Sequence, residues 1–262
     1  MRCAALSDLH VEFAPIDTAA LRADLESREV ELVLLAGDLA PVEEVAALAD
    51  AIVPSTARGL LVMGNHEPYD QHRRWSIDRA LERLRADLGT VARLRLLEDE
   101  VAVPHPELRV FGATLWSDFR LAGSAVGPAL LADYAACMND YRMIADEDGE
   151  ALHPTHTARR HQRSRAALER ALAIPFTGRT LVLSHHAPLS RNSPPRYRGD
   201  PASPLFVAAM EDVIERFAID TWVSGHTHYS CDFVLGTTRF VSAQRGYPGE
   251  SPEPFVPAVF EP

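Results

Sequence analysis

The sequence GLLVMGNHE at residues 59–67 joins a buried-type apolar run to a glycine and a group of polar side chains. The sequence ELVLLAGD at residues 31–38 repeats that order, since its apolar run also stops at a glycine, Gly37. Short apolar runs bounded by glycine are typical of buried strands. The Ala-rich stretch 42–52 between them predicts a helix, so the two runs are expected to be parallel strands of one sheet.

Three further apolar runs, at residues 2–6, 180–184 and 220–224, have the same character. Each of the five runs is followed at once by residue types that bind metals. In chain order these are Asp8 and His10, then Asp38, then Asn65 and His66, then His185 and His186, then His226 and His228. Ligands of open α/β sheets bind beyond the carboxyl ends of the strands. The sequence therefore predicts five ligand-bearing loops at one rim.

The donor atoms in these loops indicate a transition-metal site. Two aspartates, one asparagine and several histidines form a mixed oxygen and nitrogen set, which suits Mn, Fe, Zn or Co better than Ca. Seven ligands are too many for one ion and suit two divalent ions that share a carboxylate. Two such ions are a known device for phosphoryl hydrolysis.

The order D-x-H, G-D, G-N-H-E, H, G-H-x-H resembles the calcineurin-like metallophosphoesterase superfamily. The resemblance spans positions 8 to 228 and implies a four-layer α-β-β-α sandwich, with two mixed β-sheets face to face and helices outside. It implies a first metal on Asp8, His10, Asp38 and His228, and a second on Asp38, Asn65, His185 and His226. It also implies His66 as the general acid and a metal-bridging hydroxide as the attacking group.

Two departures from the family's patterns bear on the site. The protein phosphatase motif G-D-x-x-D-R-G is absent, because the stretch after Gly37 reads Asp-Leu-Ala-Pro-Val-Glu. The chain is more similar to the small bacterial phosphodiesterase and phosphatase branch. No aspartate is left in that motif to orient His66, so Glu43 and Glu44 either take this task or are solvated acids in the first turn of the following helix. His185 is preferred to His186 as the ligand because the first histidine usually binds in similar His-His sequences.

The remaining sequence predicts one domain over residues 1–262. Helices are expected at 17–28, 71–88, 155–173 and 205–217, and further strands at 100–103, 108–112, 231–235 and 239–242. Residues 113–153, with a short helix near 128–137, and the Pro-rich loop 187–204 are expected to lie near the rim of the site.

Side chains in those two segments have alternative roles. Arg191, Arg196 and Arg198 are either phosphate contacts or residues of a solvated loop. The aromatic residues of the first segment are either a substrate wall or anchors to the core; they are Trp116, Phe119, Tyr134 and Tyr141.

Composition limits the classes of function. The 262 residues are 47% hydrophobic, as expected of a globular enzyme, and carry 26 basic against 37 acidic side chains, a net charge of −11. That balance argues against binding long nucleic acids. The three cysteines lie far apart, no run is long enough for a membrane helix, and no secretory segment precedes Asp8, so we expect a cytoplasmic protein. The oligomeric state stays open.

These observations predict a metal-dependent phosphoric ester hydrolase with a small-molecule substrate and two ions, with Mn favoured. Phosphodiesters are favoured as substrates, and a phosphomonoesterase is the alternative. A non-catalytic binding module of the same fold and a nuclease are weaker alternatives.

Overall fold

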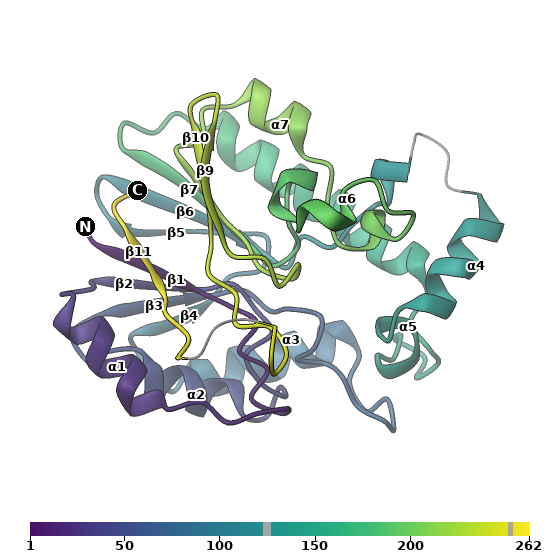
Figure 1. The fold of residues 1–262 in the computed structure, drawn as a ribbon, viewed down its shortest axis with the longest axis horizontal. Coiled ribbons are helices and arrows are strands. Elements are labelled where there is room, and N and C mark those ends of the chain that lie inside the picture. The colour runs from purple at the N-terminus through teal and green to yellow at the C-terminus, as the bar shows by residue number, and fades with distance from the viewer. Residues whose placement is uncertain (123–126, 251–253) are drawn as a thin grey trace.

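A computed structural model describes residues 1–122, 127–250 and 254–262. In these residues the strands form two sheets that lie face to face (Figure 1). The first has the order β11-β1-β2-β3-β4. Its strands are β1 Cys3–Leu6, β2 Leu32–Leu35, β3 Arg58–Leu61, β4 Leu94–Leu96 and β11 Ala258–Phe260. The second has the order β5-β6-β7-β8-β10-β9. Its strands are β5 Glu100–His105, β6 Leu108–Ala113, β7 Arg179–Ser184, β8 Thr221–Val223, β9 Cys231–Leu235 and β10 Thr238–Ser242.

Both sheets are mixed. Strands β1 to β4 are parallel and β11 runs antiparallel to β1. Strands β6, β7, β8 and β10 are parallel, with antiparallel β5 and β9 at the two edges. The predicted parallel arrangement of residues 31–36 and 59–63 is confirmed by β2 and β3, and β7 and β8 are likewise parallel in the second sheet.

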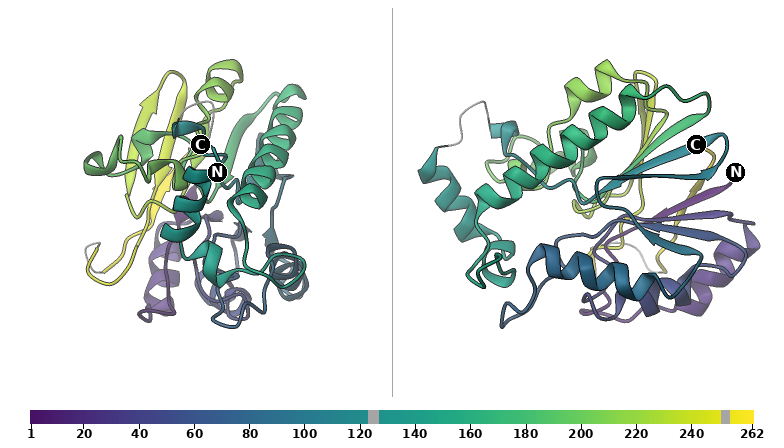
Figure 2. Two further views of the ribbon diagram at one scale, coloured as in Figure 1. Left: turned by 90° about the vertical axis from the view of Figure 1, so that its right-hand side faces the viewer. Right: turned by 180° about the vertical axis from the view of Figure 1, so that it is seen from behind.

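Helices cover the outer face of each sheet, as Figure 2 shows from two further sides. On the first sheet lie α1 Thr18–Ser27, α2 Val45–Ile52 and α3 Ile77–Leu88, and on the second lie α6 Pro154–Ala173 and α7 Glu211–Arg216. Helices α4 Pro128–Cys137 and α5 Asp140–Met143 lie on the side of the molecule opposite to the two termini (Figure 1). The predicted four-layer α-β-β-α sandwich is confirmed.

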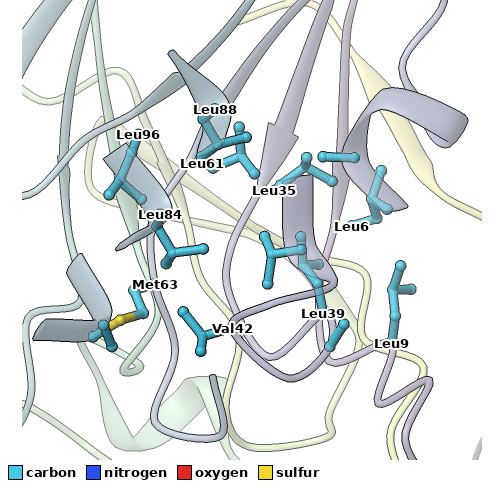
Figure 3. Close-up of a cluster of buried hydrophobic side chains, with 14 of the residues drawn as sticks. Leu6, Leu9, Leu35, Leu39, Val42, Leu61, Met63, Leu84, Leu88 and Leu96 are labelled. Atoms are coloured by element: carbon cyan, nitrogen blue, oxygen red, sulfur yellow. The ribbon is translucent and has the colours of Figure 1, made fainter. Parts of the chain in front are cut away.

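The strand period of two separates the apolar side chains into layers. In β2, Leu32 and Leu34 pack between the sheets, whereas Val33 and Leu35 pack beneath the helices. Figure 3 shows the helix-side layer, where Leu61 of β3 lies among leucines of α3. A third cluster joins β6, β7 and β8 to α6 and α7. Tight packing on both faces of each sheet holds the strand ends in place.

Two predicted helices are shorter than expected. The helix predicted at 71–88 begins at Ile77, because the Ser76 side chain accepts a hydrogen bond from the Arg79 amide and caps it there. The helix predicted at 205–217 is wrong over its first half. Val207 forms a bridge with Ala187, and the Ala208 amide bonds the Ala187 carbonyl at 2.8 Å, so α7 begins only at Glu211.

The two segments expected near the rim have their own short helices. Of the segment 113–153, residues 123–126 lie outside the described residues; the rest contains η1 Arg120–Ala122, α4 and α5. The loop 187–204 contains the 3-10 helices η2 Ser190–Asn192 and η3 Pro195–Tyr197, and η4 Ser203–Leu205 overlaps its end. Strands β4 and β11 were not expected from the sequence.

Candidate metal centre

The loops after β1, β2, β3, β7 and β8 bring the seven predicted ligands to one rim. Three overlapping clusters of donor atoms form there, each with its atoms within 4.8 Å of one another. They are Asp8, His10 and His228; His10, Asp38 and His66; and Asp38, His185 and His226. Asn65 adjoins the third cluster, because its Oδ1 lies 2.9 Å from His185 Nε2.

The first cluster has two imidazole nitrogens directed at each other. His10 Nε2 lies 3.1 Å from His228 Nε2, and His228 Nε2 lies 3.6 Å from an oxygen of Asp8. The opposite nitrogens, Nδ1, face carboxylates: Glu12 at 3.0 Å from His10, and Glu250 beside His228. With its proton on Nδ1, each ring presents a bare Nε2 to the site.

The third cluster and the adjoining Asn65 are oriented by hydrogen bonds on their outer side. His185 Nδ1 donates to the Ala36 carbonyl at 2.8 Å, so its Nε2 faces Asp38 at 3.4 Å. The Asn65 amide donates to Asp140 Oδ1 at 2.9 Å, which leaves Asn65 Oδ1 facing His185. The structure therefore directs donor atoms of His185, Asp38 and Asn65 at one another.

Asp38 lies between the first and third clusters. One carboxylate oxygen, Oδ2, is 3.7 Å from His10 Nε2 and 3.4 Å from His185 Nε2. The other, Oδ1, accepts the His66 backbone amide at 2.8 Å. Burial alone would raise the pKa of Asp38, but the neighbouring His185 and His66 outweigh it and hold that pKa well below its ordinary value. Asp38 is thus an ionised carboxylate that faces both clusters.

The side chains fit a pair of divalent cations. The Nε2 atom of His226 is buried and has no hydrogen-bond partner, which is costly unless a ligand binds it. Burial, reinforced by nearby His186 and His185, holds the pKa of His226 well below its ordinary value, so the ring is neutral and able to bind metal. Buried carboxylates and bare imidazoles together form the mixed donor set that transition metals prefer.

The backbone at the rim has conformations that are unfavourable for ordinary residues. Five of the seven predicted ligands have positive φ: Asp8 (52°), His10 (45°), Asp38 (55°), His226 (72°) and His228 (49°). Such strain concentrates at functional sites. Gly64 is required next to them, because a Cβ there would come within 2.0 Å of Asp38 Oδ1. The loops are therefore shaped for the site and not for the most stable local backbone.

Glu67 connects two of these loops through hydrogen bonds to its buried carboxylate. Its carboxylate is buried and accepts the Leu39 amide at 3.0 Å and the Gly64 amide at 2.7 Å. These two bonds join the loop after β2 to the loop after β3.

His66 lies beside the clusters with a different set of partners. Its Nδ1 is 3.3 Å from Glu12 Oε1, its Nε2 is 3.2 Å from the Tyr247 hydroxyl, and its ring stacks on Tyr69 at 4.1 Å. Burial alone would lower the pKa of His66, but the Asp38 and Glu12 carboxylates outweigh it and raise that pKa. The ring therefore carries a proton more readily than an ordinary histidine.

The carboxylate partner of His66 is neither Glu43 nor Glu44. Of the two roles left open for Glu43 and Glu44, their exposure just ahead of α2 favours solvated acids, and Glu12 faces His66 instead. Burial alone would raise the pKa of Glu12, yet its bonds with His10 and His66 lower that pKa to about 2. The signal available in the sequence was only that Glu12 follows His10 by two residues in the same loop.

His186, the alternative to His185, is buried behind the centre. Its ring lies 4.2 Å from that of His226 and 5.2 Å from that of Trp116, and it is in none of the three donor clusters. From this position His186 packs against the His226 ring and helps to hold it in place.

A cavity of about 650 Å³ opens onto the clusters. Its lining includes Asp38 and His66, residues 137–139 at the junction of α4 and α5, and part of the Pro-rich loop. Aromatic side chains also line it: Tyr69, Tyr197, Phe206 and Tyr247. The aromatic residues singled out in the sequence are instead buried in the core, which favours their role as anchors; they are Trp116, Phe119, Tyr134 and Tyr141.

The three arginines of the Pro-rich loop differ in position. Arg198 bonds the Ser193 and Arg191 carbonyls at 3.2 and 3.0 Å, which holds the loop together. The guanidinium of Arg191 packs over the Phe233 ring at 4.4 Å. Arg196 lines the cavity. Among residues 187–204, Arg196 is thus the cation placed to meet a ligand.

No helix in the described part of the chain is both long enough and apolar enough to cross a membrane.

Comparisons with known proteins agree with this geometry. A family model described as calcineurin-like phosphoesterase matches residues 1–230. The uncharacterized protein L509 of Acanthamoeba polyphaga mimivirus is 25% identical over 264 residues, covering 94% of this chain and 91% of that protein.

Two solved structures share the fold. One is phosphopantetheinyl hydrolase of Mycobacterium tuberculosis, with a TM-score of 0.70, 18% identity and coverage of 95% of this chain and 90% of the other. The second is a dimetal phosphatase from Danio rerio, with a TM-score of 0.60, 14% identity and coverage of 99% and 91%.

Proposed function

The chain belongs to the calcineurin-like phosphoesterase family, and from this premise we propose that it is a binuclear metal-dependent hydrolase of small phosphodiesters. Membership implies a metal-dependent hydrolase of phosphate esters. The observation that carries the proposed binuclear centre is the position of Asp38. One of its carboxylate oxygens, Oδ2, faces His10 on one side and His185 on the other.

We assign the ligands as two groups that share Asp38. Asp8, His10, Asp38 and His228 would hold one ion, and Asp38, Asn65, His185 and His226 the other, with manganese our first choice for both. When bound, the ions supply Lewis-acid chemistry: they acidify a water and neutralise charge on the phosphoryl group.

His66 is our candidate for the catalytic acid. Its Nε2 lies at the cavity, 3.2 Å from the Tyr247 hydroxyl, and a raised pKa favours the protonated ring. A general acid protonates the leaving oxygen as its bond to phosphorus breaks. Burial and nearby carboxylates raise the pKa of Tyr247 above its ordinary value, so its hydroxyl stays neutral and can donate to a phosphate oxygen.

Charge around the cavity favours a diester over a monoester. Asp200 and Glu250 line the cavity, and in the described residues Arg196 is its one arginine. A phosphomonoester carries about two negative charges near pH 7, since its second pKa is about 6, whereas a diester carries one. Repulsion from the two acids is therefore smaller for the diester, and the cavity has room for its second arm.

The test compares bis-p-nitrophenyl phosphate with p-nitrophenyl phosphate, using manganese-loaded protein. We expect a higher kcat/KM for the diester. The reverse order would favour the phosphomonoesterase, and protein inert towards both would favour a non-catalytic module. A phosphopantetheinyl ester belongs in the wider panel because a similar structure is a phosphopantetheinyl hydrolase.

A further inference from the structure

We propose that Glu12 is the positioning residue of His66, which it holds through Nδ1 so that Nε2 carries the proton for the leaving group. This inference rests on the proposed role of His66 as general acid. Neither the family match nor the motifs assign any task to Glu12.

The contacts of Glu12 are those the task requires. Its Oε1 lies 3.3 Å from His66 Nδ1, on the side of the ring opposite to the cavity-facing Nε2. A carboxylate on one ring nitrogen fixes the tautomer and orientation of an imidazole and stabilises its protonated form. Stacking on Tyr69 at 4.1 Å fixes the plane of the same ring.

The local backbone places Glu12 where His66 needs it. His10 has a φ of 45°, and the Phe13 amide bonds the His10 carbonyl at 3.0 Å, so the chain turns tightly after β1. The turn directs the Glu12 side chain back over the site, with 21% of it exposed. Glu12 thus takes the task that the sequence left open for Glu43 or Glu44.

Glu12 also faces a predicted metal ligand, because the same Oε1 lies 3.0 Å from His10 Nδ1. A purely structural role through His10 would weaken metal binding and slow every substrate equally. A role through His66 would slow only those substrates whose leaving oxygen needs a proton. Dependence on the leaving group therefore separates the two roles.

The experiment uses Glu12→Gln, which keeps the size of the side chain and removes its charge. Metal-loaded wild type and variant are assayed on methyl phosphodiesters with p-nitrophenyl, phenyl and alkyl leaving groups. The p-nitrophenolate ion leaves without a proton, so we expect its kcat to stay within about threefold of wild type. For the alkyl group we expect kcat to fall about 100-fold, the lower range for loss of general acid catalysis.

Three matched variants complete the set. His66→Ala should show the same dependence on the leaving group, and the double variant should lose little more, since the two residues act as a unit. Glu43→Gln should match wild type throughout. Because Glu12 also faces His10, metal content is compared at saturating manganese, where that of Glu12→Gln should equal that of wild type. A uniform loss over the three leaving groups, or a loss of metal, would overturn the proposal.

A second readout does not use activity. In zinc-loaded protein labelled with ¹⁵N-histidine, the His66 Nδ1 proton should be visible in wild type and exchange faster in Glu12→Gln. An unchanged His66 signal would also overturn the proposal. Wild type that binds two ions yet hydrolyses no phosphate ester would refute the proposed function, and the proton signal would then still decide whether Glu12 holds His66.

Discussion

The Nε2 atoms of His10 and His228, 218 residues apart in the chain, lie 3.1 Å from each other. Each ring faces a carboxylate through its other nitrogen, Glu12 for His10 and Glu250 for His228. Protons on the two Nδ1 atoms leave two lone pairs directed at one point, an arrangement that a shared cation stabilises. Asp8, 3.6 Å from His228, adds negative charge beside that point.

Replacement of Asp38 by Asn should remove both ions. The carboxylate faces His10 and His185 at 3.7 and 3.4 Å, so loss of its charge weakens both predicted groups of ligands. We expect activity to fall well beyond the roughly 10–100-fold typical of losing an outer-shell partner. Metal analysis of the dialysed variant measures this directly, and wild-type metal content would show that Asp38 is not shared.

Replacement of His66 by Ala should separate catalysis from metal binding. We expect kcat on substrates with poor leaving groups to fall about 10²–10⁴-fold, while metal content stays near that of wild type. The two values are measured on the same preparation. If the ions are lost with the ring, His66 is a ligand and its assignment as acid is wrong.

Replacement of Arg196 by Ala should weaken the binding of substrates whose second arm carries a negatively charged group. Arg196 is exposed and lines the cavity, so its contribution is limited to up to about 1 kcal/mol, or roughly a fivefold rise in KM. Arg191→Ala is the matched control, because Arg191 packs over Phe233. Equal effects of the two substitutions would show that neither arginine is selective.

Chelation should inactivate the protein without unfolding it. The sheets are held by clusters of buried apolar side chains on both faces, which do not depend on the ions. Far-UV circular dichroism after EDTA treatment should match that of the untreated protein, and added manganese should restore activity. A collapse of the spectrum would mean that the ions hold the fold.

Glu98 should make stability depend on pH. Burial raises its pKa to about 7 from an ordinary 4.5, although Thr114 donates two hydrogen bonds to it. A carboxyl with a raised pKa binds more protons in the folded state, so its contribution is full below pH 4.5 and is lost as the pH rises to 7. The free energy of unfolding of Glu98→Gln, relative to that of wild type, should therefore rise by about 1–2 kcal/mol between pH 5 and pH 8. This figure is reduced because the Glu98 residue is partly exposed. Urea unfolding at both pH values measures it, and a constant difference would refute the raised pKa.

The sequence predicted the elements in which pattern and chemistry agree. The ligand-bearing strands combine an unbroken apolar run with polar residues at its end, so both their type and their shared rim could be inferred. Strand β4 was missed because three residues with exposed Arg95 at the centre carry little signal. The first half of the helix predicted at 205–217 failed because pairing with residues 187 and 188 overrides the local pattern.

The supporting residues of the site were harder to infer. Asp140 is buried and orients Asn65 from 75 residues away, and nothing in the local sequence distinguishes it from the acids that lie at the surface. Glu12 was open to inference from its place after His10, but an acid in a loop is ordinarily solvated. Such partners emerge only when the fold fixes which loops meet.

The most direct test of this account is a manganese titration of metal-free protein, followed by hydrolysis of bis-p-nitrophenyl phosphate. We predict that activity rises until two ions are bound per chain and then stays constant. Activity that is complete with one ion, or that is the same with no ion at all, would contradict it.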